Sequence, residues 1–112
     1  MKRVLVVDDD RPTLDLVTRW LTAAGCEVHV AGTFGEGKLL IKDPIDVLIV
    51  DVRLHGFNGL QLATRARTDQ PKMRIVVVSG WEDPVLIREA AALDAVFLNK
   101  PFSEADLLKA IG

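Results

Sequence analysis

Five polar side chains stand at, or just after, the ends of apolar runs in the sequence. They are Asp8, Asp9, Asp51, Ser79 and Lys100. A buried strand end needs no charge of its own, because burying a charged group costs free energy unless a partner compensates it. We therefore interpret these three carboxylates, one hydroxyl and one ammonium group as parts of one chemical site.

The residue types in this set favour phosphoryl transfer at a divalent metal ion. Carboxylates that share a concavity raise one another's pKa unless a cation neutralises them, and Mg²⁺ (or Mn²⁺) prefers oxygen ligands of this kind. A phosphoryl group explains the lysine and the serine, because the ammonium group neutralises its oxygens and the hydroxyl donates a hydrogen bond. A carboxylate can itself attack phosphorus, and Asp51 is the predicted acceptor.

The elements that must position this set are short strands alternating with helices. The apolar runs are Val4–Val7, Cys26–Ala31, Val47–Val50, Ile75–Val78 and Val96–Leu98. Three of them are nearly all Val, Ile and Leu, which is typical of interior strands of a parallel sheet. The second run alternates, with Val28 and Val30 on one side and Glu27 and His29 on the other, which predicts an edge strand with one wet face. Such an order predicts an α/β fold with helices on both faces and a ligand site at the carboxyl ends of the strands.

Capping residues mark where the helices begin. Asp10 precedes the first helical segment, so we interpret it as a cap rather than as a metal ligand. Asp83-Pro84 places a capping residue before a proline in the first turn, and Ser103 with Asp106 forms a capping-box pattern. These patterns predict helices after residues 10, 83 and 103.

Composition excludes several classes of protein. A net charge of −2 provides no basic field for nucleic-acid phosphates, and no apolar run approaches the ~20 residues of a membrane span. The single cysteine, Cys26, excludes an internal disulfide and suits a reducing cytoplasm. We expect one cytoplasmic domain over residues 1–112.

Four motifs together resemble the receiver domain of two-component response regulators. They are "VLVVDDD" from Val4, "DVLIVDVRLHGFNG" from Asp46, "IVVVSGW" from Ile75 and "FLNKPF" from Phe97. The resemblance covers essentially the whole chain. It implies a flavodoxin-like (CheY-like) doubly wound sheet of five parallel strands in the order 2-1-3-4-5. The chain is then a whole regulator or the N-terminal part of a longer one.

The resemblance also implies a role for each residue of the set. Asp51 is the phosphoacceptor and a direct Mg²⁺ ligand, together with Asp9 and the backbone carbonyl of Arg53, while Asp8 acts through water. Lys100 is the conserved lysine of the family, and the Lys100-Pro101 bond is expected to be cis.

Two further positions are implied to carry the switch. Ser79 resembles the hydroxyl that reaches the phosphoryl group, and Phe97 occupies the place of the aromatic residue whose rotamer follows it. Because Phe97 lacks a tyrosine hydroxyl, its movement would act by packing alone. The responding face is formed by the fourth helix, the fifth strand and the last helix.

The sequence departs from the family pattern at a few positions. His55 stands where the family usually has proline, and Gly37 lies in the second helical segment. Arg53 and Trp81 follow the acceptor and the switch serine by two residues, where family members vary and tune the lifetime of the phosphoryl group. Our hypothesis is that Trp81 restricts attacking water and lengthens that lifetime.

The implied function is a phosphorylation-activated switch that catalyses only its own phosphoryl transfer and dephosphorylation. Its donor would be a histidine kinase or phosphotransfer protein, and its target a downstream output domain or protein. A phosphorylation-dependent homodimer is left open. The alternatives are a degenerate receiver that binds proteins without phosphorylation and an Mg²⁺-dependent phosphohydrolase. The hydrolase lacks its general acid, because Arg53 occupies that position.

Overall fold

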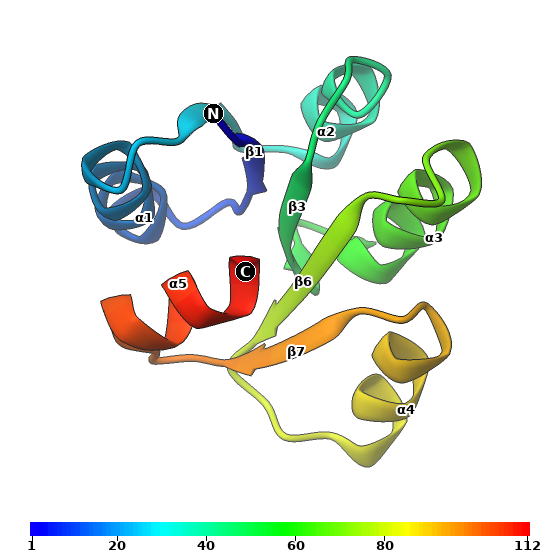
Figure 1. Ribbon diagram of the computed structural model, residues 1–112. Helices are drawn as coiled ribbons and strands as arrows, with labels where there is room; N and C mark the ends of the chain where they lie inside the picture. Colours follow the sequence, from blue (N-terminus) through cyan, green and yellow to red (C-terminus); the bar gives the residue numbers. More distant parts are fainter.

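The central sheet of the computed structural model, which describes residues 1–112, is parallel throughout (Figure 1). Its strands are β1 (Arg3–Val7), β2 (Glu27–Ala31), β3 (Val47–Asp51), β6 (Arg74–Ser79) and β7 (Val96–Asn99). They lie in the order β2-β1-β3-β6-β7. Two short strands, β4 (Arg53–Leu54) and β5 (Phe57–Asn58), form a separate hairpin, so this order is the expected 2-1-3-4-5 arrangement, and the predicted fold class is confirmed.

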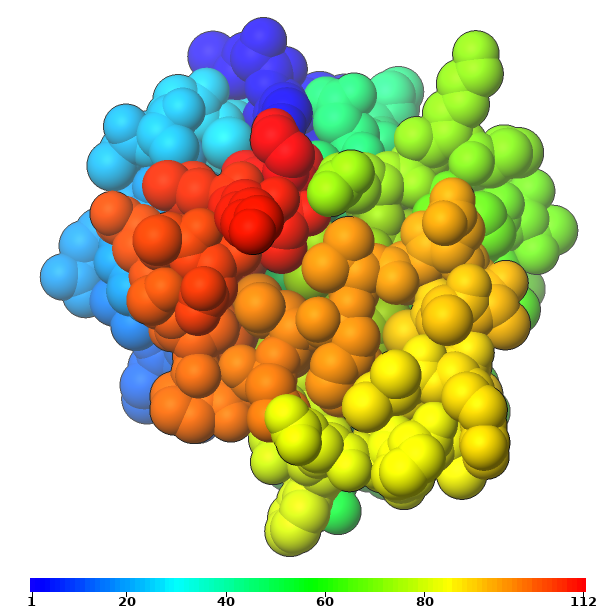
Figure 2. Space-filling model, turned by 60° about the horizontal axis from the view of Figure 1, so that its bottom comes forward, coloured from blue at the N-terminus to red at the C-terminus, as the bar shows by residue number.

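Helices cover both faces of the sheet. They are α1 (Arg11–Ala23), α2 (Phe34–Leu40), α3 (Gly59–Asp69), α4 (Pro84–Ala92) and α5 (Glu104–Ile111). Helices α1 and α5 lie on one face, and α2, α3 and α4 lie on the other (Figure 1). Seen from below, α5, β7 and α4 lie beside one another on one surface (Figure 2). None of the helices combines the length and apolar character needed to cross a membrane.

The core consists of two apolar layers, one on each face of the sheet. Along β1, Val4 and Val6 pack into the layer under α1 and α5, whereas Leu5 and Val7 pack into the layer under α2 and α3. Successive side chains of a strand point to opposite faces, so a strand covered on both sides must be apolar at every position. This explains the uninterrupted apolar runs in the sequence.

The predicted caps are present. The side chain of Asp10 accepts a hydrogen bond from the backbone N–H of Thr13, and Asp83 caps α4 in the same way. Ser103 and Asp106 form the reciprocal capping box of α5. Each cap satisfies backbone donors that the first turn of a helix leaves unpaired.

Strand β2 lies at the edge of the sheet, as its alternating sequence predicted. Glu27 and His29 form a hydrogen bond on its wet side, with 2.8 Å between Oε2 and Nε2. The prediction for the other side holds only in part, because Val28 packs against the core whereas Val30 is exposed. An edge strand is paired on one side only, so its side chains are buried less completely than those of an interior strand.

Helix α2 forms despite its glycines, and Gly37 has a packing role there. A Cβ atom at Gly37 would lie 2.8 Å from Cδ2 of Leu62 and 3.2 Å from the methyl groups of Val7. The missing side chain therefore lets α2 approach the sheet and α3 closely.

A small hairpin follows the predicted acceptor and was not expected from the sequence. Strands β4 (Arg53–Leu54) and β5 (Phe57–Asn58) pair antiparallel. The two residues between them, His55 and Gly56, have φ angles of 27° and 80°. Two successive positive φ angles are typical of the tight turns that match the twist of a hairpin.

Candidate functional site

Three polar residues are buried at the carboxyl edge of the sheet. Asp8, Asp51 and Ser79 are only 3%, 8% and 1% exposed, and no other polar or charged residue of the chain is buried. They follow or end β1, β3 and β6, which are neighbours in the sheet. The fold therefore gathers three of the predicted site residues at one edge.

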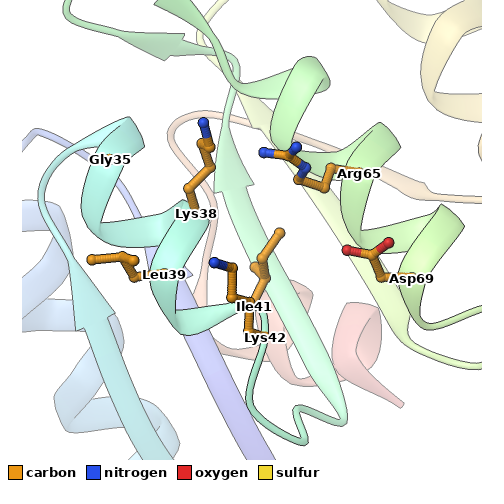
Figure 3. A pocket seen from close by; sticks show the side chains of 7 residues that line it. All are labelled: Gly35, Lys38, Leu39, Ile41, Lys42, Arg65 and Asp69. Carbon is orange, nitrogen blue, oxygen red and sulfur yellow. The ribbon is translucent and has the colours of Figure 1, made fainter.

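The hollow between α2 and α3 lies apart from this edge. It has a volume of about 630 Å³ and is lined by Lys38, Lys42, Arg65 and Asp69 among others (Figure 3). None of the predicted site residues lines it. A second hollow, of about 650 Å³, runs along the β4–β5 hairpin and reaches Asp9 and His55.

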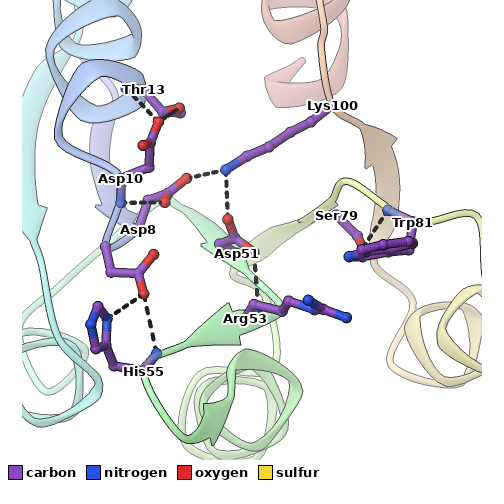
Figure 4. A network of polar contacts seen from close by, with 10 residues as sticks. Asp8, Asp10, Thr13, Asp51, Arg53, His55, Ser79, Trp81 and Lys100 are labelled. Carbon is purple, nitrogen blue, oxygen red and sulfur yellow. Dashed lines mark hydrogen bonds and ion pairs between the residues drawn. The ribbon is translucent and has the colours of Figure 1, made fainter.

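Lys100 joins two of the carboxylates. Its Nζ lies 2.8 Å from Oδ2 of Asp8 and 2.6 Å from Oδ2 of Asp51 (Figure 4). The Lys100-Pro101 peptide bond is cis, as the resemblance implied. One ammonium group thus compensates two carboxylates on neighbouring strands, which makes their burial tolerable.

This arrangement shifts the acidity of both partners. Burial raises the pKa of Asp8 above its ordinary value, although the hydrogen bonds from Lys100 and from the backbone of Asp10 partly offset it. Burial alone would lower the pKa of Lys100, but hydrogen bonds to Asp51 and Asp8 outweigh burial and raise it. Lys100 therefore stays charged at neutral pH.

Backbone groups fix the remaining oxygens of these two carboxylates. The N–H of Asp10 donates to Oδ1 of Asp8, and the N–H of Arg53 donates to Oδ1 of Asp51, each at 2.9 Å. Each carboxylate thus accepts from Lys100 on one oxygen and from a backbone N–H two residues later on the other (Figure 4). Both are held in defined orientations.

Asp9 has a different partner. Its Oδ2 accepts hydrogen bonds from the backbone N–H of His55 at 3.1 Å and from the ring Nδ1 of His55 at 2.7 Å. No three acidic, histidine or cysteine side chains converge as a ready-made metal site. The donor chemistry nevertheless fits Mg²⁺, because Asp8, Asp9 and Asp51 supply hard carboxylate oxygens at one edge of the sheet.

The predicted switch residues lie on the two strands beyond the acceptor. Oγ of Ser79 accepts a hydrogen bond from the backbone N–H of Trp81 at 3.1 Å. Phe97, on β7, is half-buried and packs against the core layer under α2, α3 and α4. Ser79 forms no hydrogen bond to Asp51 in this structure.

Arg53 and Trp81 form a pair at the mouth of the site. Cζ of Arg53 lies 4.7 Å from the centre of the Trp81 ring, within cation–π range, although the indole is 57% exposed. Together with Ser79 they line a hollow of about 290 Å³. The sequence placed both residues near the site, but it did not predict that they contact each other.

Gly59 is a site residue that sequence reasoning missed. A Cβ atom at Gly59 would lie 1.9 Å from the carbonyl oxygen of Asp51, so no other residue fits without moving the acceptor strand. Asn58 caps α3 at the same point by accepting from the N–H of Leu60. The Asn-Gly pair marked the start of a helix, but only the fold shows what Gly59 touches.

Sequence comparison gives the same assignment as the geometry. A family model described as "Response regulator receiver domain" matches residues 4–112. The response regulator receiver protein CpdR of Brucella abortus is 30% identical over 99% of this chain and 94% of its own length. The photosynthetic apparatus regulatory protein RegA of Rhodobacter capsulatus is 29% identical over 98% of this chain, which spans only 61% of RegA.

Solved structures agree with this match. A CheY-like receiver domain protein from Methanospirillum hungatei superposes with a TM-score of 0.94 at 31% identity, covering 99% of this chain and 90% of that one. A response regulator from Burkholderia pseudomallei, determined with a phosphorylated aspartic acid, a calcium ion and citrate, has a TM-score of 0.92 at 27% identity, covering 100% of this chain and 67% of that one. With its sheet order, its buried carboxylates and these relatives in agreement, the chain belongs to the family of response regulator receiver domains.

Proposed function

We propose that this chain is a phosphorylation-activated switch of a two-component system that accepts a phosphoryl group on Asp51. The observation that carries the proposal is the buried Asp8–Lys100–Asp51 group, in which one ammonium links two carboxylates at the sheet edge. A structural core gains little from such a group. A reaction that transfers a charged phosphoryl group needs both the acceptor and the cation.

In the proposed transfer, a carboxylate oxygen of Asp51 attacks the phosphorus of the donor. The bond from phosphorus to the leaving nitrogen or oxygen breaks, and the leaving group keeps the electron pair. Lys100 already contacts Asp51 and is placed to neutralise a phosphoryl oxygen there. When bound, Mg²⁺ or Mn²⁺ would neutralise the remaining charge of the phosphoryl group. Asp9, Asp51 and the backbone carbonyl of Arg53 would hold the ion directly, and Asp8 would act through water.

Ser79 is the proposed sensor of the phosphoryl group. Its Oγ accepts from the Trp81 N–H, so its own hydroxyl hydrogen is free to be donated. Donation to a phosphoryl oxygen would draw the β6–α4 loop toward Asp51 and open space for Phe97 to move inward. A local charge thereby biases an element with two arrangements.

The proposed output surface is formed by α4, β7 and α5 (Figure 2). Val85 and Ile87 on α4 are exposed apolar residues, which suits contact with a protein. We propose that this surface engages an output domain, a separate protein or a second copy of the chain. The net charge of −2 argues against direct contact with nucleic acid.

The proposed donor is a histidine kinase or a phosphotransfer protein in the cytoplasm. The chain then catalyses only its own phosphorylation and dephosphorylation, within one receiver domain that spans residues 1–112. A phosphoryl group in the Burkholderia pseudomallei relative lies on an aspartic acid, which supports the same acceptor chemistry here. The Arg53–Trp81 pair is placed to control how water reaches it.

The test is an intact mass measured after incubation with Mg²⁺ and acetyl phosphate. We expect one added phosphoryl group on the wild type and none on Asp51→Asn or on a chelated sample. An unmodified wild type would be examined with beryllofluoride, a stable mimic of the phosphoryl group, because fast hydrolysis hides the product. Failure to bind the mimic would refute the proposal and favour a phosphorylation-independent binding module.

A further inference from the structure

His55 holds Asp9 with two donors from one residue. The backbone N–H and the ring Nδ1 both contact Oδ2 of Asp9, at 3.1 Å and 2.7 Å. A carboxylate only accepts hydrogen bonds, so Nδ1 must carry the hydrogen in this contact. A proline at this position would have neither donor. The contact is therefore a property of this chain and not of the usual family sequence.

The hairpin that carries His55 is fixed from two sides. Its turn residues have positive φ angles, which a two-residue hairpin turn requires. On β5, the ring of Phe57 stacks on the ring of Phe34 at the start of α2, with centroids 4.9 Å apart and planes 12° apart. His55 is thus presented to Asp9 by a braced loop.

This contact divides the three carboxylates between two partners. Lys100 binds Asp8 and Asp51, whereas His55 binds Asp9. The three carboxylates therefore do not converge as one metal site. A metal ion that uses Asp9 together with Asp51 thus requires the Asp9 carboxylate to turn, and a turn that moves Oδ2 breaks both contacts with His55. The free energy needed to break the Asp9–His55 contact then reduces the net free energy of Mg²⁺ binding.

We propose that His55 is a latch that competes with the metal ion for Asp9 and so sets the Mg²⁺ affinity of the site. The latch rests on the metal-dependent function proposed above. Mg²⁺ binding and the release of Asp9 from His55 are then one coupled event. His55 acts here as a positioning residue, because it touches a ligand and neither the acceptor nor the phosphoryl group.

The test is the dissociation constant of Mg²⁺ for the unphosphorylated protein, measured by titration calorimetry. His55→Gly suits the positive φ angle and removes only the ring donor. We expect it to bind Mg²⁺ about two- to fivefold more tightly, as the loss of one solvent-exposed hydrogen-bonded pair implies. His55→Asn tolerates the same backbone conformation and keeps a side-chain N–H donor, so its affinity should stay near that of the wild type.

His29→Ala is the matched control, because it removes the other histidine–carboxylate pair of the chain, which lies on β2. Its Mg²⁺ affinity should be unchanged. Equal affinity of wild type and His55→Gly would overturn the latch, and weaker binding by His55→Gly would show instead that His55 orients Asp9 for the metal. In both cases a wild type that accepts phosphate from acetyl phosphate leaves the proposed function standing. A wild type that binds neither Mg²⁺ nor the phosphoryl mimic would refute both.

Discussion

The buried centre and the exposed rim of the site are built differently. At the centre, each oxygen of Asp8 and Asp51 has a partner, either Lys100 or a backbone N–H. At the rim, Asp9 contacts His55 and Arg53 stacks on Trp81, and both contacts involve well-exposed side chains. Buried charges must be fully compensated, whereas exposed pairs contribute little and can vary. The proposed phosphoryl transfer therefore depends on the centre, whereas the proposed control of metal affinity and phosphoryl lifetime depends on the rim.

Gly59→Ala should have the largest effect on the buried centre of the site. The added methyl group would collide with the carbonyl oxygen of Asp51, so we expect a loss of about 3 kcal/mol in the free energy of unfolding, together with impaired phosphorylation. Urea denaturation and the intact-mass assay measure the two effects. Gly35→Ala is the control, because a Cβ there meets nothing within 4 Å, and it should raise stability. Equal stability of both variants would contradict the close approach.

Asp8→Asn should separate stability from function at the centre. Burial raises the pKa of Asp8, so its ionised form is less stable in the folded state than in the unfolded chain. We expect the variant to gain about 1–2 kcal/mol in the free energy of unfolding at pH 7, and to lose Mg²⁺ affinity and phosphorylation.

The pH dependence of that gain follows from the sign of the shift. The cost is complete where Asp8 is ionised in both states, and it disappears below the ordinary value of 3.8, where Asp8 is protonated in both. Urea denaturation from pH 3 to pH 7 should therefore show the two proteins converging in acid. A constant difference across this range would mean that the stabilisation has another origin.

Trp81→Ala should change the rim without disturbing the centre. Removing the indole opens the hollow beside Ser79 and removes the stack with Arg53, so attacking water reaches the phosphoryl group more easily. We expect dephosphorylation to accelerate only about two- to fivefold, because an indole that is itself well exposed shields the site incompletely. Phosphate release after removal of the donor gives the rate. Trp20→Phe changes the other tryptophan, which does not line the hollow of Ser79 and Trp81, and it should leave the rate unchanged. An unaltered rate in Trp81→Ala would show that the shielding hypothesis is wrong.

Phe57→Leu should have the smallest effect, and it tests whether the aromatic stack holds the hairpin at the rim. The substitution keeps an apolar side chain but loses the stacked contact with Phe34, so we expect a loss of about 1 kcal/mol in the free energy of unfolding. Phosphorylation of Asp51 should persist. Because the hairpin is then less firmly held, Mg²⁺ should bind slightly more tightly. Weaker Mg²⁺ binding would indicate that the brace serves the metal and not the latch.

Much of the fold was readable in the sequence because it rests on local patterns. The strands followed from apolar runs, and the starts of α1, α4 and α5 followed from capping residues that act within one turn. The edge position of β2 followed from its alternation. The β4–β5 hairpin did not, because its two-residue strands are too short for a periodic pattern and its turn is His-Gly rather than Asn-Gly or Asp-Gly.

The sequence by itself determined which residues would reach the carboxyl edge of the sheet, because parallel strands bring their ends together whatever their detailed packing. Their partners at this edge depend on how the separate segments pack in three dimensions. Asp9 meets His55 across 46 positions of the chain, and Gly59 presses on the backbone of Asp51. Such contacts require separate segments to be positioned to within a few tenths of an ångström. No local pattern encodes those distances, which arise only when the layers of the fold pack together.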